Sequence, residues 1–134
     1  MFTIDRLDHL VLTVQDLART VDFYTRVLGM EAQTFGAGSG PVRQALRFGR
    51  SKINLHEAGR EFEPKAQAPA PGTADLCFVT ATPLADVVAH LEACDVPLLL
   101  PPSRRTGALG PIESIYLRDP DGNLIEISIY PAKG

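Results

Sequence analysis

Basic residues are too few in this sequence to build a strongly cationic surface. The 13 Lys and Arg are outnumbered by 16 Asp and Glu, and the formal net charge at pH 7 is −3. This balance argues against a nucleic-acid-binding protein, because such proteins hold the phosphate backbone with clustered cations. No apolar run approaches the roughly 20 residues of a membrane span, and the opening MFTIDRLDHL lacks the regions of a signal peptide. We therefore predict a cytoplasmic protein with neither nucleic-acid nor membrane partners.

Cysteine is scarce as well. The two cysteines, Cys77 and Cys94, each lie in an apolar stretch, which favours buried thiols in a reducing compartment over a disulfide. The sequence has no CxxC motif, no phosphate-binding glycine loop and no nucleophile elbow. Neither cysteine has a neighbour that would activate it, so thiol catalysis is disfavoured.

The first half of the chain alternates between strand and helix patterns. Asp16 is a candidate N-cap, and Gly29 is a candidate C-terminal stop for the helix between them. Apolar residues recur at helical spacing within it, at Leu17, Val21, Tyr24 and Leu28. Strands are predicted at residues 7–14, around 30–35, 42–48 and 52–57, with a glycine-rich turn, GAGSG, at 36–40.

A segment rich in Ala and Pro, residues 59–73, shows no apolar periodicity and is predicted to be a linker. The pattern then restarts with a strand at 74–80. Thr82 is a candidate N-cap with Pro83 in the first helical position. The helix would bury Leu84, Val87, Val88 and Leu91. Further strands are predicted near 97–100, 112–118 and 123–130.

The two halves therefore repeat the same order of elements, at about residues 5–58 and 74–131. We predict one domain spanning residues 1–134, of α+β class, with two βαβββ modules whose curved mixed sheets are each backed by a helix. Each half alone would leave one sheet face uncovered, so the halves must pair. The long linker permits pairing between two chains, which predicts a homodimer.

Strand alternation places Glu126 on a different face from its aliphatic neighbours. Ile125, Ile127 and Ile129 share the face under the helix, and Glu126 lies on the other. In the first strand, His9 likewise points away from the helix.

The repeat register relates polar positions in the two halves. It matches His9 to Asp75 and Glu126 to Asn54, and His56 lies one pleat beyond Asn54. Imidazole and carboxylate groups suit Zn²⁺, Fe²⁺, Mn²⁺, Ni²⁺ or Co²⁺, and a cation would offset the cost of desolvating a carboxylate. We predict a divalent metal site from His9, His56, Asp75 and Glu126.

Simpler interpretations exist for each residue taken alone. His9 would be a hydrogen-bonded histidine, Glu126 a salt-bridged edge carboxylate and Asp75 a cap near a turn. His56 is a candidate ligand, base or surface residue. Other candidates for contact with a substrate are cationic (Lys65, and Arg104 and Arg105 before the TGALG loop) or aromatic (Phe48, Phe62 and Tyr116), with solvated charge and core packing as the alternatives.

Three stretches carry a resemblance to a known family. DHLVLTV, a helix ending in FYTRVLGM, and RDPDGNLIEIS together resemble the glyoxalase/bleomycin-resistance/extradiol-dioxygenase superfamily, also called vicinal oxygen chelate proteins. HEAGREFEPKA, PGTADLCF and RTGALGPIESIY resemble a glyoxalase-domain-containing subgroup that includes bacterial virulence-associated proteins. The resemblance covers nearly the whole chain.

The resemblance implies a divalent metal in a cupped sheet, with ligands from the first and last strands of each module. His9 matches the usual first-strand histidine and Glu126 the last-strand glutamate. Asp75 stands where a histidine is usual, and Asn54 where glyoxalase I often has a glutamate. In small members the modules pair between chains, which would bring His9 and the strand of Asn54 and His56 from one chain and Asp75 and Glu126 from its partner.

Three functions follow from this resemblance. The first is a glyoxalase I-like lyase or isomerase on a small molecule with neighbouring oxygens, with Glu126 or His56 as base. Asn54, Arg105 and Tyr116 would contact this substrate. The second is an Fe²⁺ extradiol-type dioxygenase, against which the substitution at Asp75 counts. The third is a non-catalytic protein that sequesters a drug or metabolite, as resistance proteins do.

Overall fold

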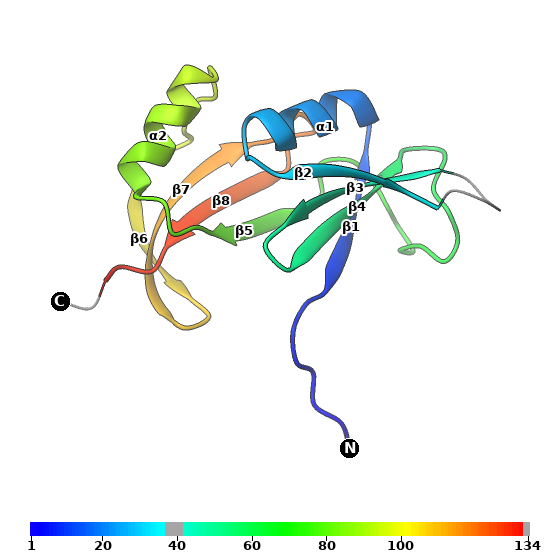
Figure 1. The fold of residues 1–134 in the computed structure, drawn as a ribbon, viewed down its shortest axis with the longest axis horizontal. Helices are drawn as coiled ribbons and strands as arrows, with labels where there is room; N and C mark the ends of the chain where they lie inside the picture. Colours follow the sequence, from blue (N-terminus) through cyan, green and yellow to red (C-terminus); the bar gives the residue numbers. More distant parts are fainter. Residues whose placement is uncertain (37–41, 133–134) are drawn as a thin grey trace. The chain divides into compact units, whose positions relative to one another are not determined.

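The computed structural model describes residues 1–36 and 42–132, and the chain divides into two compact units, Met1–Pro71 and Gly72–Gly134. In the described residues, each unit contains one strand, one helix and three further strands, in the predicted order (Figure 1). The predicted fold class, α+β with two βαβββ modules, is confirmed. Neither helix, at ten residues each, is long enough to cross a membrane. Most of the glycine-rich turn predicted at 36–40 lies outside the described residues.

The first unit is a four-stranded mixed sheet with a helix on one face. Its strands are ordered β1-β4-β3-β2, with β1 parallel to β4 and the other pairs antiparallel. The elements are β1 (His9–Val14), α1 (Leu17–Arg26), β2 (Glu31–Phe35), β3 (Arg43–Phe48) and β4 (Ser51–Glu57).

Helix α1 begins as predicted, because the Asp16 carboxylate accepts a hydrogen bond from the Arg19 backbone N–H at 2.9 Å. Of the predicted apolar stripe, only Tyr24 is fully buried. The buried residues are Thr20, Phe23 and Tyr24, whereas Leu17 and the other aliphatic residues of the predicted stripe are only half-buried. Thr20 can be buried because its hydroxyl donates to the Asp16 carbonyl at 2.9 Å.

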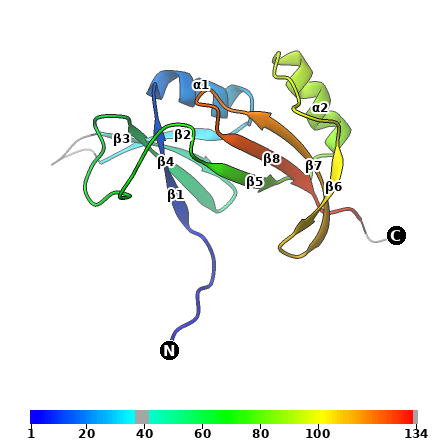
Figure 2. The same cartoon turned by 180° about the vertical axis from the view of Figure 1, so that it is seen from behind.

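The second unit repeats this topology, with the order β5-β8-β7-β6 and β5 parallel to β8 (Figure 2). Its elements are β5 (Asp75–Val79), α2 (Leu84–Ala93), β6 (Ser103–Gly107), β7 (Gly110–Arg118) and β8 (Leu124–Ile129). Helix α2 buries Leu84 and Leu91 of the predicted face. Its N-cap is Pro83 without a side-chain hydrogen bond, so the predicted Thr82 cap is wrong by one position.

The strand predicted at 97–100 is wrong. Pro97, Pro101 and Pro102 lack the backbone N–H that a ladder requires, and the strand forms only after them, as β6. The predicted TGALG loop is shorter than expected, because the pairing of β6 with β7 extends to Gly107 and Gly110. Arg104 and Arg105, predicted to precede this loop, lie within β6, which pairs with β7 from Ser103 to Gly107.

Candidate functional site

The two sheets each have one packed face, and the predicted site residues lie on the other. In the first unit, Leu12, Val14, Ile53 and Leu55 are buried on the packed face. We call the opposite side of these strands the open face of the first unit. By strand alternation and register it carries His9, Val11 and Thr13 of β1, Lys52, Asn54 and His56 of β4, and Arg43, Ala45 and Arg47 of β3.

The second unit follows the same rule. Ile125 and Ile127 are buried on its packed face, and Glu126 points to the other side. The open face of the second unit carries Asp75, Cys77 and Val79 of β5, Leu124, Glu126 and Ser128 of β8, and Ser114 and Tyr116 of β7. The observed register places Cys77 opposite Glu126 and Val11 opposite Asn54, so Glu126 and Asn54 occupy equivalent positions, as the repeat predicts.

Glu126 is the centre of a hydrogen-bond network on the open face of the second unit. The Ser114 hydroxyl donates to its Oε2 at 2.6 Å, and the Ser128 hydroxyl lies 3.3 Å from the same oxygen. The two hydroxyls are 2.6 Å apart, and both serines are fully buried. A carboxylate in an aliphatic strand is therefore held by hydroxyl donors on the face opposite the isoleucines, which offsets the cost of desolvating it.

Cys77 lies between the two predicted carboxylate ligands of this unit. Partial desolvation of the thiol raises the pKa of Cys77 although the residue is exposed as a whole, and the charges of Glu126 and Asp75 raise it further. The thiol stays protonated at neutral pH and is a poor nucleophile. The prediction that both thiols are buried is wrong, since Cys77 is exposed and Cys94 is half-buried, and both are free thiols.

Tyr116, a predicted substrate contact, lies beside Glu126, and Arg105, another, lies against the Tyr116 ring. Tyr116 is directly opposite Glu126 in the register of β7 and β8. The Arg105 guanidinium lies 5.3 Å from the centre of the Tyr116 ring. Burial raises the pKa of the Tyr116 phenol and the charge of Glu126 raises it further, while Arg105 lowers it. The phenol is therefore a hydrogen-bond donor at neutral pH.

In the first unit, the exposed His9 is oriented by its neighbour in sequence. Its Nδ1 lies 2.8 Å from the Asp8 carboxylate. This hydrogen bond is the main cause that lowers the pKa of Asp8. Because Nδ1 faces Asp8, Nε2 is the ring nitrogen left for a further contact, and histidines that bind metals are held in this way.

His56 is buried, and its environment keeps it neutral. Burial lowers its pKa, and the positive charge of Arg43 lowers it further. The His56 ring meets the Phe62 ring edge-on at 5.3 Å, and the Arg43 guanidinium lies 5.1 Å from the centre of the same ring. Phe62 belongs to the predicted linker, so this segment packs onto the open face of the first unit. On the same face, the buried Asn54 Oδ1 has no hydrogen-bond partner among the described residues.

Within residues 1–36 and 42–132, no three His, Cys, Asp or Glu side chains gather closely enough to hold a metal ion. Asp75 and Glu126 share the open face of the second unit, two register positions apart on β5 and β8. His9 and His56 share the open face of the first unit, but they lie four register positions apart on β1 and β4, so this unit alone does not bring them together.

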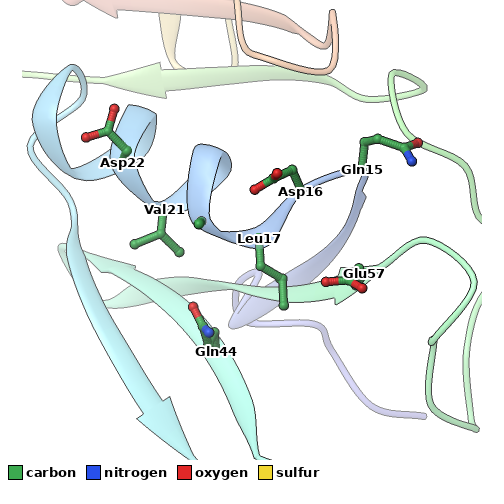
Figure 3. Close-up of a pocket in the computed structure, with 8 residues that line it drawn as sticks. Gln15, Asp16, Leu17, Val21, Asp22, Gln44 and Glu57 are labelled. Atoms are coloured by element: carbon green, nitrogen blue, oxygen red, sulfur yellow. The ribbon is translucent and has the colours of Figure 1, made fainter.

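A pocket of about 730 Å³ lies on the other side of the first sheet, against α1 (Figure 3). Its lining includes Asp16, Asp22 and Glu57 but none of the predicted site residues.

The partners of the site residues were not predicted from the sequence. Asp8 precedes His9 directly, and its position next to a candidate ligand was the available signal. Ser114 and Ser128 could not be identified as partners of Glu126, because their contact depends on the register between β7 and β8. Two of the other predicted contacts lie elsewhere, since Lys65 pairs with Glu63 at 3.6 Å and Phe48 lines a separate pocket beside β2.

Close relatives have been named or solved. The chain is 57% identical over 127 residues to "Virulence protein STM3117" of Salmonella typhimurium, covering 95% of this chain and 85% of the relative. It is 56% identical over 124 residues to "Glyoxalase domain-containing protein RDO1" of Mycosarcoma maydis, covering 92% of this chain and 68% of the relative. The solved structure of an integron cassette protein from V. cholerae matches with a TM-score of 0.92 and 56% identity, covering 98% of this chain and 99% of that one.

More distant structures share the fold alone. A lactoylglutathione lyase from Agrobacterium tumefaciens matches with a TM-score of 0.69 and 22% identity over 94% of both chains. TnmS3, an antibiotic binding protein from Streptomyces sp. CB03234, matches with a TM-score of 0.72 and 18% identity over 98% of this chain and all of that one. The family model matches residues 6–127. The chain therefore belongs to the glyoxalase/bleomycin resistance protein/dioxygenase superfamily.

Proposed function

We propose that this protein is a metal-dependent enzyme of the vicinal oxygen chelate type, acting in the cytoplasm on a small molecule with neighbouring oxygens. The two units would form one functional domain and assemble as a homodimer. A divalent ion of the Mn, Fe, Ni, Zn or Co group would be held by His9, His56, Asp75 and Glu126. The observation that carries this proposal is the Glu126 carboxylate, which two buried hydroxyls orient on the open face of the second unit.

The chemistry of the four donors fits such an ion. His9 directs Nδ1 to Asp8 and leaves Nε2 for coordination. His56 is neutral at neutral pH, as a ligand must be. The charges of Asp75 and Glu126 both raise the pKa of Cys77, so two carboxylates share the open face of the second unit. Two imidazoles with two carboxylates make a donor set that suits octahedral transition metals.

The bound ion would polarise the neighbouring oxygens of the substrate and make the adjacent C–H more acidic. Side chains of the protein would carry out the remaining steps. Glu126, or His56 where it is not a ligand, would accept the proton, since His56 is neutral and buried. Tyr116 would donate a hydrogen bond to the substrate through its protonated phenol, and Arg105 would attract negative charge beside it. Asn54 would contact the substrate through its unpaired Oδ1.

We favour a lyase or isomerase of the glyoxalase I type. The fold shared with a lactoylglutathione lyase supports this class. The fold shared with TnmS3 supports a second candidate, a protein that sequesters a drug or metabolite without converting it. An extradiol dioxygenase usually needs two histidines and one carboxylate, which this donor set offers only if His56 replaces the usual second histidine.

Metal analysis of the protein purified without chelator tests the proposal directly. We expect about one transition metal per chain, lost in Glu126→Gln and His9→Gln. The matched controls are Glu113→Gln, on the neighbouring strand β7 and exposed, and His90→Gln on α2. Metal occupancy that survives in both site variants would refute the ligand set. Isomerase assays on hemithioacetals, and oxygen uptake with catechols after anaerobic Fe²⁺ loading, then separate the two reactions, and inactivity in both favours the binding protein.

A further inference from the structure

A second group of charged residues lies on the first unit, beside His9 but outside the proposed metal site. A cavity of about 220 Å³ opens there, several times the ~30 Å³ that one water occupies in the liquid. Its lining consists of Asp8, Gln33, Arg47, Arg50, Ser51 and Lys52. Three cations therefore face one carboxylate, in a protein whose net charge is −3.

None of the three cations forms an ion pair with a carboxylate in the described part of the chain, although the charge of Lys52 contributes to the lowered pKa of Asp8. Among the described residues, no Asp or Glu oxygen lies within 4.0 Å of the charged groups of Arg47, Arg50 or Lys52. Glu31 is the cross-strand neighbour of Arg47 on β2, yet the two form no ion pair. The Lys52 ammonium instead lies 4.3 Å from the centre of the Phe35 ring. An aromatic ring holds an ammonium in place without cancelling its charge.

The register also brings like charges together. Arg47 and Lys52 are directly opposite each other on β3 and β4. Like charges in directly opposite positions destabilise a pair of strands. An anion in the cavity would remove this repulsion and would gain hydrogen bonds from the guanidinium, the ammonium and the Ser51 hydroxyl.

The position of the cavity relates it to the proposed metal site. Lys52 is the register partner of His9 on the parallel strand β1, and both residues lie on the open face. Asp8 lines the cavity and accepts the hydrogen bond from His9. A molecule with an acidic group in this cavity would therefore extend along the face toward His9.

We propose that this cavity binds an anionic group, a carboxylate or a phosphate, of the small-molecule substrate, through Arg47, Arg50 and Lys52. The inference rests on the proposed function, which it deepens by naming the class of substrate as an organic acid or a phosphorylated compound. Its cationic residues are distinct from Lys65, Arg104 and Arg105, the cations predicted from the sequence to contact the substrate.

Titration of the full-length protein with two probes tests the cavity. Inorganic phosphate and malonate are added separately at constant ionic strength, with chloride as the reference, and the backbone amide resonances of Ser51 and Lys52 are followed by NMR. We expect saturable shifts with at least one probe. Arg47→Gln and Lys52→Gln should each weaken binding about tenfold, which equals about 1.4 kcal/mol. Arg26→Gln is the matched control, because it removes the same charge from α1, where Arg26 pairs with Asp22.

The stronger probe identifies the anion. Saturation by phosphate alone indicates a phosphorylated substrate, and saturation by malonate alone indicates a carboxylate. The proposal is overturned if neither probe saturates, or if Arg26→Gln weakens binding as much as Arg47→Gln does.

Metal content is measured on the same samples. If the protein contains metal but shows no saturable anion binding that Arg47→Gln and Lys52→Gln weaken, this inference is refuted and the proposed function stays intact. If the anion binds as predicted but the protein contains no metal, the result supports anion binding in the cavity and refutes the metal-dependent function.

Discussion

Replacing Ser114 with alanine deletes one oxygen atom from the centre of the Glu126 network. The Ser114 hydroxyl is fully buried, donates to Glu126 Oε2 at 2.6 Å and lies 2.6 Å from the Ser128 hydroxyl. Its removal takes away the shortest hydrogen bond that holds the carboxylate. We expect Ser114→Ala to destabilise the protein and to loosen the orientation of Glu126.

The magnitude follows from the kind of bond that is lost. A hydrogen bond to a charged group contributes about 1.5–3 kcal/mol to stability. The Ser128 hydroxyl, 3.3 Å from the same oxygen, can move closer and recover part of the loss. We therefore expect the lower end, a loss of about 1.5 kcal/mol in the free energy of unfolding, which for a chain of this size is roughly 5 °C in melting temperature.

The chain supplies a matched control on the neighbouring strand. Ser103 is the register partner of Ser114 across β6 and β7, and its buried hydroxyl has no hydrogen-bond partner among the described residues. Ser103→Ala removes the same atom, but here it relieves an unsatisfied group. We expect this variant to be as stable as the parent or more stable. Urea denaturation of both variants measures the difference, and equal destabilisation would refute the argument.

Measuring metal affinity provides a second test of the Ser114→Ala and Ser103→Ala variants. Residues that orient a metal ligand typically contribute 10–100-fold to affinity. Ser114→Ala should therefore weaken metal binding by about tenfold or more, and Ser103→Ala should leave it unchanged. A loss of stability without a loss of affinity would make the serine network structural only.

Burial and Arg43 lower the pKa of His56 below its ordinary value of 6.5. As the pH falls, His56 is therefore protonated in the unfolded chain before it is protonated in the folded protein. The free energy of unfolding should fall as the pH drops below 6.5 until folded His56 protonates, and His56→Gln should flatten this region in urea titrations at a series of pH values. Asp75→Ala should abolish the rise in melting temperature that added metal produces, whereas Asp75→His should keep it and shift the preference toward softer ions; a rise that persists in Asp75→Ala would remove Asp75 from the ligand set. Sedimentation at micromolar concentration should give twice the chain mass, and a monomer would contradict the homodimer.

The faces of the central strands could be predicted from the sequence because alternation with a period of two is a local property. Glu126 and its isoleucine neighbours show this clearly, since the strand is short and one face is wholly aliphatic. The equivalence of Glu126 with Asn54 also held, because both modules use the same register between first and last strands.

The failures have a common physical cause, which is tertiary context. In α1, apolar residues lie on two neighbouring faces of the helix. Packing buries Phe23 together with Tyr24 of the predicted stripe, while Leu17 is only half-buried. The run of leucines at 98–100 has strand composition, but the prolines around it prevent a ladder. Contacts such as those of Phe62 with His56 join a linker to a strand, and no spacing in the sequence encodes them.

The two open faces differ in charge although they are built on the same repeat. Equivalent positions carry His9 in the first unit and Asp75 in the second, and likewise Asn54 and Glu126. The first unit adds Arg47 and Lys52 to this face, while the second adds neutral serines that donate to a carboxylate. Carboxylate ligands attract a metal ion through their negative charge, and an anionic substrate requires cations that those carboxylates do not neutralise. Duplication followed by opposite substitutions would meet both requirements in one small chain, with the carboxylates that attract the metal in one unit and the cations that attract the substrate in the other.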